Sequence, residues 1–343
     1  MVGDAGSIHM RRWAAGIAGR GHAVQVLSER RWDDAPVPVE LLPPFVRGRL
    51  NLPVLASRVR AAARRMRPDV VHAHYASSYG LIAALSRVRP LVISVWGGDV
   101  EVFPRHVLNR RVLSFTLRQA ARIAVTSQHL RAVTLRYAPQ APISVIPWGV
   151  DEIWLDAPRA AEPAGPFTVV NNKHLEATYG LDLLLAAMAA LEQPWVLWLL
   201  GSGAWETELR QQADRLGVAE RVRWPGQVPP GVVRSIMDGA HAAVFPSRRE
   251  SFSVATLEAS ARGLPVIGAR TGGLPEVIDE GVTGLLVPPG DVGALSAALA
   301  RLAGDAGLRA RLGEAGRAMV REQFRWEASL DGVLRLYQEA GRS

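Results

Sequence analysis

The sequence predicts an α/β protein with two doubly wound domains, each built on a parallel sheet that helices cover on both faces. Short, almost continuously apolar runs alternate with helical patterns, and this series occurs twice along the chain. The 343 residues exceed the size at which one hydrophobic core usually stops growing, which also favours two domains. The Pro- and Ala-rich segment 147–166 is the expected linker. We therefore place an N-terminal domain at 1–150 and a C-terminal domain at 151–343, whose last helix, about 322–343, is a candidate to pack back toward the N-terminal domain.

The expected strands are runs of Val, Ile and Leu that turn residues separate. In the first half they are 23–27, 37–41, 69–73, 91–95, 122–126 and 143–146. In the second half they are 167–171, 195–200, 221–224, 242–245, 265–268 and 284–287. The first strand of the N-terminal domain is the exception, because a helical pattern already runs by Met10 and only Met1 and Val2 remain for the strand. We expect a start placed several residues too late or a trimmed chain; the alternative is a central sheet that lacks one member.

Composition excludes several kinds of chemistry. The chain has no cysteine, so disulfides, thiolate nucleophiles and Cys-ligated zinc are absent. It also has no Asp-x-Asp triplet and no spaced cluster of His and Asp, so we expect no metal. We expect no other cofactor either. The longest apolar stretches, such as 183–191, are about half of what a bilayer span requires. Because the first 30 residues carry arginines throughout and no apolar core segment, we expect no signal peptide and a cytoplasmic enzyme.

Charge differs between the two halves. Residues 1–150 hold 21 Arg against 8 Asp and Glu, a net charge of +13. Residues 151–343 hold 18 Arg and one Lys against 24 Asp and Glu, a net charge of −5. A basic first half predicts an anionic partner for that half. The alternative is the uneven surface of an arginine-rich chain.

The segment 45–69 is the most basic part of the first half. Apolar residues such as Leu55 and Val59 recur in it at helical spacing, with arginines such as Arg58, Arg64 and Arg65 around them. One interpretation is a sheet-covering helix with a solvated arginine face. The other is a helix that lies on an anionic membrane surface.

The stretch ESFSVATLE, which begins at Glu250, carries the first candidate site. It predicts a helix over 254–262, with Ser253 as the N-cap and Gly263 at its end. Glu258 falls on or beside the apolar stripe of that helix, and a half-buried carboxylate is costly unless a partner such as the hydroxyls of a ribose binds it. Glu250 lies near the helix N-terminus, where backbone N–H groups favour an anion. The alternative for two isolated glutamates is a solvated loop residue and a salt-bridged one.

The surroundings of these glutamates resemble a known family. The segment ESFSVATLEASARGLPVIGARTGGLPEVIDEGVTGLLVPPGD, with its G-x-P-V and GGLPE elements, resembles the nucleotide-sugar-binding segment of the retaining GT-B glycosyltransferases of family 4. GDAGSIHMRRWA near the N-terminus is similar to this family too, as are 69–80, 92–100, 145–151, 199–217 and 221–233. The resemblance covers nearly the whole chain. It implies two Rossmann-like domains that face each other across a cleft, the first holding the acceptor and the second the donor.

The resemblance also implies an activity. It is the metal-independent transfer of a sugar from a nucleotide-diphosphate donor to a glycan or lipid-linked acceptor, with retention of the anomeric configuration, in cell-envelope polysaccharide or glycolipid synthesis. The alternatives are a nucleotide-sugar epimerase of the same fold and a non-catalytic relative that binds sugar nucleotides. The expected partners are the donor, the acceptor and an anionic membrane surface, with no nucleic acid. The expected location is the cytoplasm or the inner face of the cell membrane.

By the same resemblance, Glu258 binds the ribose, and Glu250 is a catalytic residue that contacts the transferred sugar. Lys173, the only lysine among 40 basic residues, is expected at the diphosphate. Backbone amides near Gly272 and Gly273, and around residues 251–253 before the helix, would line the sugar and the phosphates. The further donor-binding candidates are Arg248, Ser251, Phe252, Ser253, Gly201, Gly203, Gly272 and Gly273.

The acceptor-side candidates follow strand ends in the N-terminal domain. They are Gly3, Asp4, Ser7, His9, His74, Trp96 and Gly97. Asp99 is the general-base candidate from this domain and the second catalytic candidate. For His74, a packed or solvated histidine is the alternative interpretation.

Three positions depart from the family pattern. Trp96 stands where family members often carry a histidine that contacts the donor sugar. Ser253 stands where a glycine is common. The second basic residue for the diphosphate has no clear counterpart, so His174 and Arg248 are the candidates to replace it.

Overall fold

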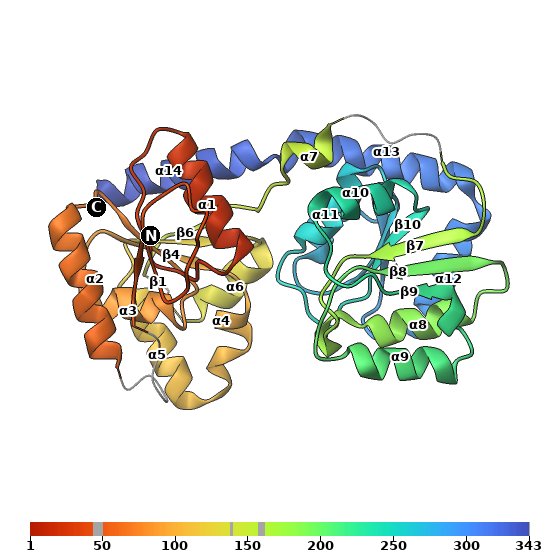
Figure 1. Ribbon diagram of the computed structural model, residues 1–343, viewed down its shortest axis with the longest axis horizontal. Coiled ribbons are helices and arrows are strands. Elements are labelled where there is room, and N and C mark those ends of the chain that lie inside the picture. Colours follow the sequence, from red (N-terminus) through yellow and green to blue (C-terminus); the bar gives the residue numbers. More distant parts are fainter. Residues whose placement is uncertain (44–50, 138–139, 157–161, 343) are drawn as a thin grey trace. The chain divides into compact units, whose positions relative to one another are not determined.

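The computed structural model describes residues 1–43, 51–137, 140–156 and 162–342 (Figure 1). The chain forms two compact units. The first unit comprises Met1–Pro147 together with Ser329–Ser343, and the second comprises Trp148–Ala328. The Arg-rich segment 45–69 and the expected linker 147–166 each include residues that lie outside the described ranges.

The first unit contains a parallel sheet assembled from the predicted runs. Its strands are β1 (Val26–Ser28), β2 (Val39–Leu41), β3 (Val71–His74), β4 (Leu91–Val95), β5 (Arg122–Val125) and β6 (Ile143–Val145). β1 pairs with β2, and β3 to β6 pair in chain order, all in parallel. Every residue of β3 and β4 is buried, as expected of strands that helices cover on both faces. The strands predicted for this half of the chain are confirmed, except that the one expected at 23–27 begins only at Val26.

A single residue, Val2, joins the two parts of this sheet. Val2 forms parallel bridges to Leu27 of β1 and to Ala73 of β3. The Val2 N–H donates to the His72 carbonyl at 2.8 Å, and the Leu27 N–H donates to the Met1 carbonyl at 2.8 Å. Val2 therefore lies in the sheet between β1 and β3, where the sequence leaves only Met1 and Val2 for a strand.

Helices cover the sheet of the first unit on both faces. They are α1 (Ile8–Gly19), α2 (Leu52–Met66), α3 (Tyr79–Ser86), α4 (Gly98–Glu101), α5 (Val107–Arg118), α6 (Gln128–Leu135) and, from Ser329 onward, α14 (Trp326–Gly341). The apolar face of α2, which includes Leu55 and Val59, is buried in the same core cluster as Val71 of β3. The described part of 45–69 is thus a covering helix. A cavity of about 540 Å³ lies beside Val2, and parts of β1, β3, α1, α2 and α14 line it.

The second unit contains a six-stranded parallel sheet. Its strands are β7 (Phe167–Asn171), β8 (Trp195–Leu199), β9 (Val222–Arg223), β10 (Ala242–Phe245), β11 (Val266–Ala269) and β12 (Gly284–Val287). Their order is β12-β11-β10-β7-β8-β9, so the chain turns to opposite sides of the sheet after β7 and after β10. The helices are α7 (Glu152–Leu155), α8 (Leu181–Ala189), α9 (Glu206–Arg215), α10 (Pro230–Asp238), α11 (Val254–Ala261), α12 (Val292–Gly304) and α13 (Ala306–Gln323). The strands predicted for this half are also confirmed.

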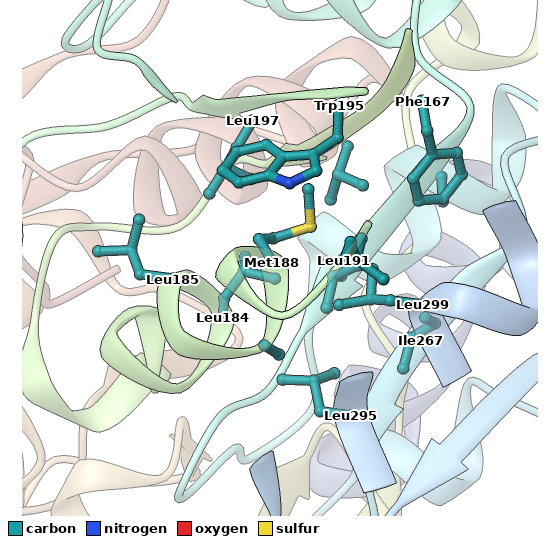
Figure 2. Close-up of a cluster of buried hydrophobic side chains, with 14 of the residues drawn as sticks. Phe167, Leu184, Leu185, Met188, Leu191, Trp195, Leu197, Ile267, Leu295 and Leu299 are labelled. Carbon is teal, nitrogen blue, oxygen red and sulfur yellow. The ribbon is translucent and has the colours of Figure 1, made fainter. Parts of the chain in front are cut away.

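The main core of the second unit lies between its sheet and the helices α8 and α12 (Figure 2). Trp195, at the start of β8, is buried, and Met188 of α8 points toward its ring. Ile267 of β11 and Leu299 of α12 belong to the same cluster. Each such side chain contributes about 1.5–3 kcal/mol through burial. The core therefore gives the loops that follow β7 and β10 a rigid base.

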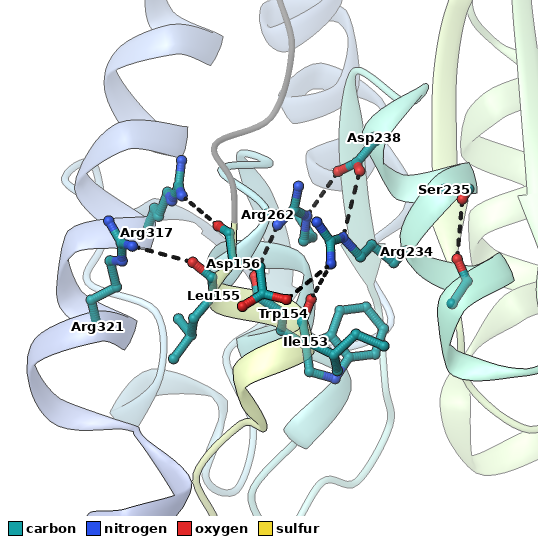
Figure 3. Close-up of polar contacts among 11 residues, drawn as sticks. Ile153, Trp154, Leu155, Asp156, Arg234, Ser235, Asp238, Arg262, Arg317 and Arg321 are labelled. Atoms are coloured by element: carbon teal, nitrogen blue, oxygen red, sulfur yellow. Dashed lines mark hydrogen bonds and ion pairs between the residues drawn. The ribbon is translucent and has the colours of Figure 1, made fainter.

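A buried arginine fixes the C-terminal end of α11 to α7 and α10 (Figure 3). Arg262, which is 1% exposed, donates to Asp238 of α10 at 2.8 Å and to the Trp154 carbonyl at 3.1 Å. Arg234 of α10 reaches the Ile153 carbonyl at 2.8 Å and the second oxygen of Asp238 at 3.9 Å. Because α11 carries Glu258, this network at the C-terminal end of the helix helps to fix the position of a candidate site residue.

Replacing Arg262 by methionine is expected to lower the free energy of unfolding by about 2–4 kcal/mol, because the Trp154 carbonyl loses its donor and Asp238 its closest cation. Urea denaturation followed by circular dichroism measures the change. Arg321→Met is the matched control, since the exposed Arg321 makes a single 3.2 Å bond to the Leu155 carbonyl and its removal is expected to cost less than about 1 kcal/mol. Equal stability of the two variants would contradict the role assigned to Arg262.

Candidate functional site

The candidate donor site lies where the second sheet reverses its winding. The neighbouring strands β7 and β10 lead into loops that diverge, because β8 lies on one side of this pair and β11 on the other. In open parallel sheets, ligands bind outside the carboxyl ends of the strands at such a switch point. The loop 172–176 after β7 and the loop 246–253 after β10 are the two segments at this position.

An ion pair connects these two loops. The Lys173 Nζ lies 2.7 Å from the Glu250 Oε2, and the two side chains are only 11% and 10% exposed. The Ser247 hydroxyl lies 3.4 Å from the same carboxylate oxygen, and the Lys173 Nζ lies 5.2 Å from the centre of the Tyr179 ring. Because both charged groups are largely enclosed, each requires a partner of opposite charge. Two residues that the sequence predicts for the donor site are therefore in direct contact.

Glycines allow the loops to approach so closely. A Cβ on Gly272, whose φ is +53°, would lie 1.6 Å from the Glu250 carbonyl oxygen, and a Cβ on Gly201 would lie 2.3 Å from the Lys173 carbonyl oxygen. Gly203 is in similarly close contact with Leu175. These predicted glycines thus fix the backbones that carry Lys173 and Glu250.

The Gly273 N–H does not match the expectation that it lines the sugar. It donates to the Glu250 carbonyl at 2.9 Å, so it holds the loop instead. Phe252 also differs from a ligand contact, because its side chain is buried in the core and its ring centre lies 6.1 Å from that of Phe324. The Gly273 N–H is thus already used within the fold. The Phe252 side chain is packed in the core, so Phe252 can offer a ligand only its backbone.

Glu258 is half-buried on α11, as its helical register predicts. The Asn172 amide donates to the Glu258 Oε2 at 2.8 Å. Its neighbour Asn171 is buried and donates to the Val244 carbonyl of β10 at 2.6 Å, which ties the β7 loop to the adjacent strand. The two asparagines were not among the predicted site residues. Their signal is the polar run NNK directly after an apolar strand.

Ser253 begins α11 in a conformation that glycine favours. Its φ is +90°, and its hydroxyl lies 2.8 Å from the Thr256 hydroxyl and accepts from the Thr256 N–H at 3.4 Å. The predicted N-cap is therefore confirmed. The preceding Ser251 is half-buried at the same loop. The backbone geometry explains in physical terms why a glycine suits position 253, and the hydroxyl contacts offset part of the strain of a serine there.

Arg248 is bound within the fold. Its guanidinium donates to both oxygens of Asp182, at 2.7 and 2.6 Å, and to the Ala177 carbonyl at 2.8 Å. The hydrogen bond to Asp182 raises the pKa of Arg248. A bidentate pair of this kind orients the guanidinium strongly. His174 is exposed, and its Nδ1 lies 3.3 Å from the Ser202 carbonyl. Lys173 is therefore the stronger candidate for a diphosphate.

The acceptor-side candidates of the first unit gather at the ends of β3 and β4. The ring centres of His9 and His74 lie 6.0 and 5.3 Å from that of Trp96, and Tyr75 lies 6.4 Å from it. Neither ring nitrogen of the buried His74 has a hydrogen-bond partner among the residues that the structure describes. Burial, with His72 as a lesser cause, lowers the pKa of His74 well below its usual range, so this imidazole is neutral.

The loop between Val2 and α1 holds the other predicted residues. Gly3 packs against the Met10 sulfur, which a Cβ would approach to 2.8 Å. Asp4 accepts from the Gly6 N–H at 2.8 Å and lies 3.6 Å from Arg30. Ser7 is the N-cap residue of α1, without a hydrogen bond from its side chain to the helix. These residues shape the loop, and Gly3 lies next to His74, since a Cβ on Gly3 would be 3.4 Å from the His74 Cβ.

His72 has a structural environment that the sequence did not indicate. Its Nδ1 lies 2.6 Å from the Tyr337 hydroxyl of α14, and its Nε2 lies 2.7 Å from the Ser94 hydroxyl of β4. Burial lowers the pKa of His72 to about 3 and raises that of Tyr337. His72 is therefore a packed histidine of β3.

Asp99 is enclosed by backbone. It is 0% exposed, and its carboxylate accepts from the N–H groups of Ala76 at 2.8 Å, Trp96 at 3.2 Å and Gly97 at 2.9 Å. Gly97 supplies a φ of +121° at the start of α4, which brings its N–H into this position. Burial raises the pKa of Asp99 to about 6, although the backbone hydrogen bonds oppose the shift. This geometry makes Asp99 an anchor for the loops after β3 and β4, and its expected role as a general base stays a prediction.

The raised pKa of Asp99 predicts a pH-dependent contribution to stability. Because the native state binds the Asp99 proton more tightly than the unfolded chain, this contribution is fully present below about pH 4 and is lost as the pH rises through about 6. The difference in unfolding free energy between the wild type and Asp99→Asn is expected to fall by up to about 3 kcal/mol across that window and then stay constant. Urea titrations at closely spaced pH values measure it. A difference that grows with pH would mean that the backbone hydrogen bonds outweigh burial.

Among the described residues, no group of three or more His, Cys, Asp or Glu side chains could hold a metal ion. No helix in the described ranges is both long and apolar enough to cross a bilayer.

Comparisons with known proteins connect this geometry to a family. Residues 153–319 match the family described as Glycosyl transferases group 1, and residues 1–127 match Glycosyl transferase 4-like. The D-inositol 3-phosphate glycosyltransferase of Segniliparus rotundus is 32% identical over 395 residues, which cover 99% of this chain and 86% of that protein. A glycogen synthase of Mycobacterium tuberculosis is 29% identical over 296 residues, which cover 81% of this chain and 70% of that protein.

Solved structures share the fold. Sucrose-phosphate synthase from Thermosynechococcus elongatus has a TM-score of 0.85 at 24% identity and covers 98% of this chain and 94% of its own. Anabaena Alr3699/HepE, solved in complex with UDP-glucose, has a TM-score of 0.82 at 20% identity and covers 98% of each chain. Both similarities support the GT-B arrangement of two Rossmann-like domains. The chain belongs to the group 1 glycosyl transferases and is a glycosyltransferase of the GT-B fold.

Proposed function

We propose that the second unit binds a nucleotide-diphosphate sugar at the loops after β7 and β10, with Lys173 at the diphosphate, Glu258 at the ribose and Glu250 at the sugar. The observation that carries this proposal is the Lys173–Glu250 ion pair at the switch point of the sheet. Before the donor binds, each side chain neutralises the other. The anionic diphosphate would then replace Glu250 as the partner of Lys173, and the freed carboxylate would accept hydrogen bonds from sugar hydroxyls.

The proposed chemistry follows from where charge develops. The bond between the anomeric carbon and the β-phosphate oxygen breaks, and negative charge accumulates on the leaving nucleoside diphosphate. An ammonium held next to the β-phosphate stabilises that charge, and a nearby carboxylate stabilises the oxocarbenium-like carbon. An acceptor hydroxyl attacks from the face that the diphosphate leaves, and its proton passes to a phosphate oxygen, so the anomeric configuration is retained. The reaction requires no further cofactor.

The first unit would supply the acceptor side. The rings of His74, His9 and Trp96 form one cluster at the carboxyl ends of β3 and β4. The neutral imidazole of His74 and the indole of Trp96 suit the hydroxyl groups and apolar faces of a glycan or of a lipid-linked sugar. The names of the relatives, which include enzymes of inositol-phosphate glycosylation, glycogen synthesis and colanic acid synthesis, support a role in polysaccharide or glycolipid assembly.

Ligand-induced stabilisation tests the donor assignment. UDP is the first candidate because solved structures of the same fold contain UDP and UDP-glucose. A nucleoside diphosphate present at a hundred times its Kd is expected to raise the free energy of unfolding by about 2.7 kcal/mol. A thermal-shift series with UDP, GDP and ADP, followed by their sugars, measures this in the wild type and in Lys173→Met. A lack of stabilisation by all three diphosphates would refute the proposed donor.

Hydrolysis of the donor without an acceptor separates an enzyme from a non-catalytic binder. The family membership favours a transferase over an epimerase. An active transferase slowly passes the sugar to water, whereas a binder shows the thermal shift alone. Release of free sugar by the wild type is the expected result.

A further inference from the structure

Two adjacent asparagines lie where β7 passes into its loop, and the first of them serves the fold. Asn171 is 1% exposed, and both polar groups of its side chain are bonded. Its amide donates to the Val244 carbonyl at 2.6 Å, and its Oδ1 accepts from the Lys173 N–H at 2.9 Å. These bonds tie the loop to β10 and hold its turn, so Asn171 explains the local backbone by itself.

The second asparagine, Asn172, is satisfied on one side only. Its amide donates to the Glu258 Oε2 at 2.8 Å. Its Oδ1 is buried and accepts no hydrogen bond from any residue in the described ranges. A buried acceptor without a donor is unfavourable, and such groups in folded proteins are nearly always bonded. The bond to Glu258 therefore accounts for the orientation of this amide, and the needs of the loop do not.

The orientation of the Asn172 amide cannot be reversed. An ionised carboxylate only accepts hydrogen bonds, so the NH₂ side of the amide must face Glu258 and the carbonyl side must face away from it. A hydrogen bond to a charged acceptor is also stronger than one between neutral groups. The helix α11 that carries Glu258 is fixed at its C-terminal end by Arg262. The Glu258 carboxylate is thus held both through its helix and at one of its oxygens.

A carboxylate held in this way can distinguish ribose from deoxyribose. It has about four lone pairs, so the bond from Asn172 leaves it able to accept from two vicinal hydroxyls as well. When one hydroxyl is missing, a mobile carboxylate can turn toward water. A half-buried carboxylate that Asn172 holds in place cannot turn, and the missing hydrogen bond is not replaced. A site whose polar groups stay unpaired in this way rejects a ligand that lacks the hydroxyl.

We propose that Asn172 is a positioning residue that makes the donor site selective for ribonucleotide sugars over 2′-deoxyribonucleotide sugars. The proposal rests on the proposed function, because it requires the ribose at Glu258. It narrows the class of donor to nucleoside diphosphate sugars that carry both vicinal hydroxyls, and it excludes sugars linked to deoxythymidine diphosphate. Asn172 acts on the donor through Glu258, so its effect should be confined to the recognition of the ribose.

Paired calorimetric titrations test the proposal. The full chain is titrated with UDP and with 2′-deoxy-UDP, which differ only in the 2′-hydroxyl, and likewise with GDP, ADP and their 2′-deoxy forms. For the diphosphate that binds, we expect the wild type to prefer the ribose form about a hundredfold. In Asn172→Ala this ratio should fall to about tenfold or less, mainly because the ribose form binds more weakly. Asn172→Asp keeps the shape of the side chain but repels Glu258, and it should lower the ratio too.

An asparagine of the first unit is the matched control. Asn109 of α5 donates to the Phe103 carbonyl at 2.8 Å, and Asn109→Ala should leave the ratio within about twofold of the wild type. Circular dichroism shows whether each variant is folded.

The possible outcomes separate this proposal from the donor assignment. A purely structural role of Asn172 would weaken both ligands by the same factor and leave the ratio unchanged, which would overturn the proposal while the donor site stands. A wild type that binds both forms equally well would overturn it without any variant. If none of the three diphosphates binds, the donor site itself is refuted, and the role of Asn172 with it.

Discussion

Replacing Glu250 by glutamine is expected to lower the turnover number of sugar transfer by a factor of about a hundred to ten thousand, while the nucleoside diphosphate still binds. Glutamine keeps the shape of the side chain and removes its negative charge. That charge is proposed to act on the transferred sugar, where positive charge develops in the transition state, and not on the nucleotide. The loop should keep its fold, because its backbone is fixed by the Gly273 N–H and by the close contact with Gly272.

Donor hydrolysis and thermal shift together measure this prediction. Hydrolysis of the sugar nucleotide reports turnover, and the shift with the nucleoside diphosphate reports binding. Glu206→Gln is the matched control, since Glu206 is a surface residue of α9 that pairs with Arg210. If Glu250→Gln hydrolyses the donor at the wild-type rate, the role assigned to this carboxylate is wrong.

The second large effect is expected from Lys173. Lys173→Met should raise the Kd of the nucleoside diphosphate about a hundredfold or more. The reason is that the variant lacks the ammonium that is proposed to leave Glu250 and bind the diphosphate. The substitution should also lower the free energy of unfolding of the unliganded protein by about 1–3 kcal/mol, since the Glu250 carboxylate, 10% exposed, then loses its partner at 2.7 Å. Titration calorimetry gives the first quantity and urea denaturation the second.

Lys173→Arg distinguishes charge from shape. Arginine keeps the positive charge but is planar and longer, and the space here is bounded by the Tyr179 ring and by the backbone against Gly201. We expect it to recover only part of the affinity. Arg210→Met, on the surface of α9, should leave the Kd within about twofold of the wild type. Unchanged nucleotide affinity in Lys173→Met would exclude this residue from the diphosphate site.

The features that local sequence determines were predictable. Apolar runs between turn residues located the strands of both sheets, because a strand covered on both faces must be apolar at nearly every position. Helix α11 could be placed from its N-cap Ser253 and from Gly263, whose φ is +71°. Its 3.6-residue period also gave the half-burial of Glu258.

Contacts between distant parts of the chain were not predictable in the same way. His72 and Tyr337 are 265 positions apart, and neither residue type indicates the other as its partner. Asp99 looks like a general base in the sequence, and only the fold reveals that three backbone N–H groups enclose it. Arg262 directly follows α11, and an exposed cation is common at that position of a helix. Its burial could not be predicted from the sequence, because it results from contacts with α7 and α10.

The ion pair between Lys173 and Glu250 involves the only lysine of the chain. Protein produced with isotope-labelled lysine would therefore contain one labelled side chain, and its magnetic resonance spectrum would contain a single ε-methylene signal. Ring currents from Tyr179 and the exchange of a carboxylate for a phosphate would both shift that signal. One resonance would thus follow the occupancy of the candidate donor site through a complete reaction cycle, without any probe being introduced by mutation.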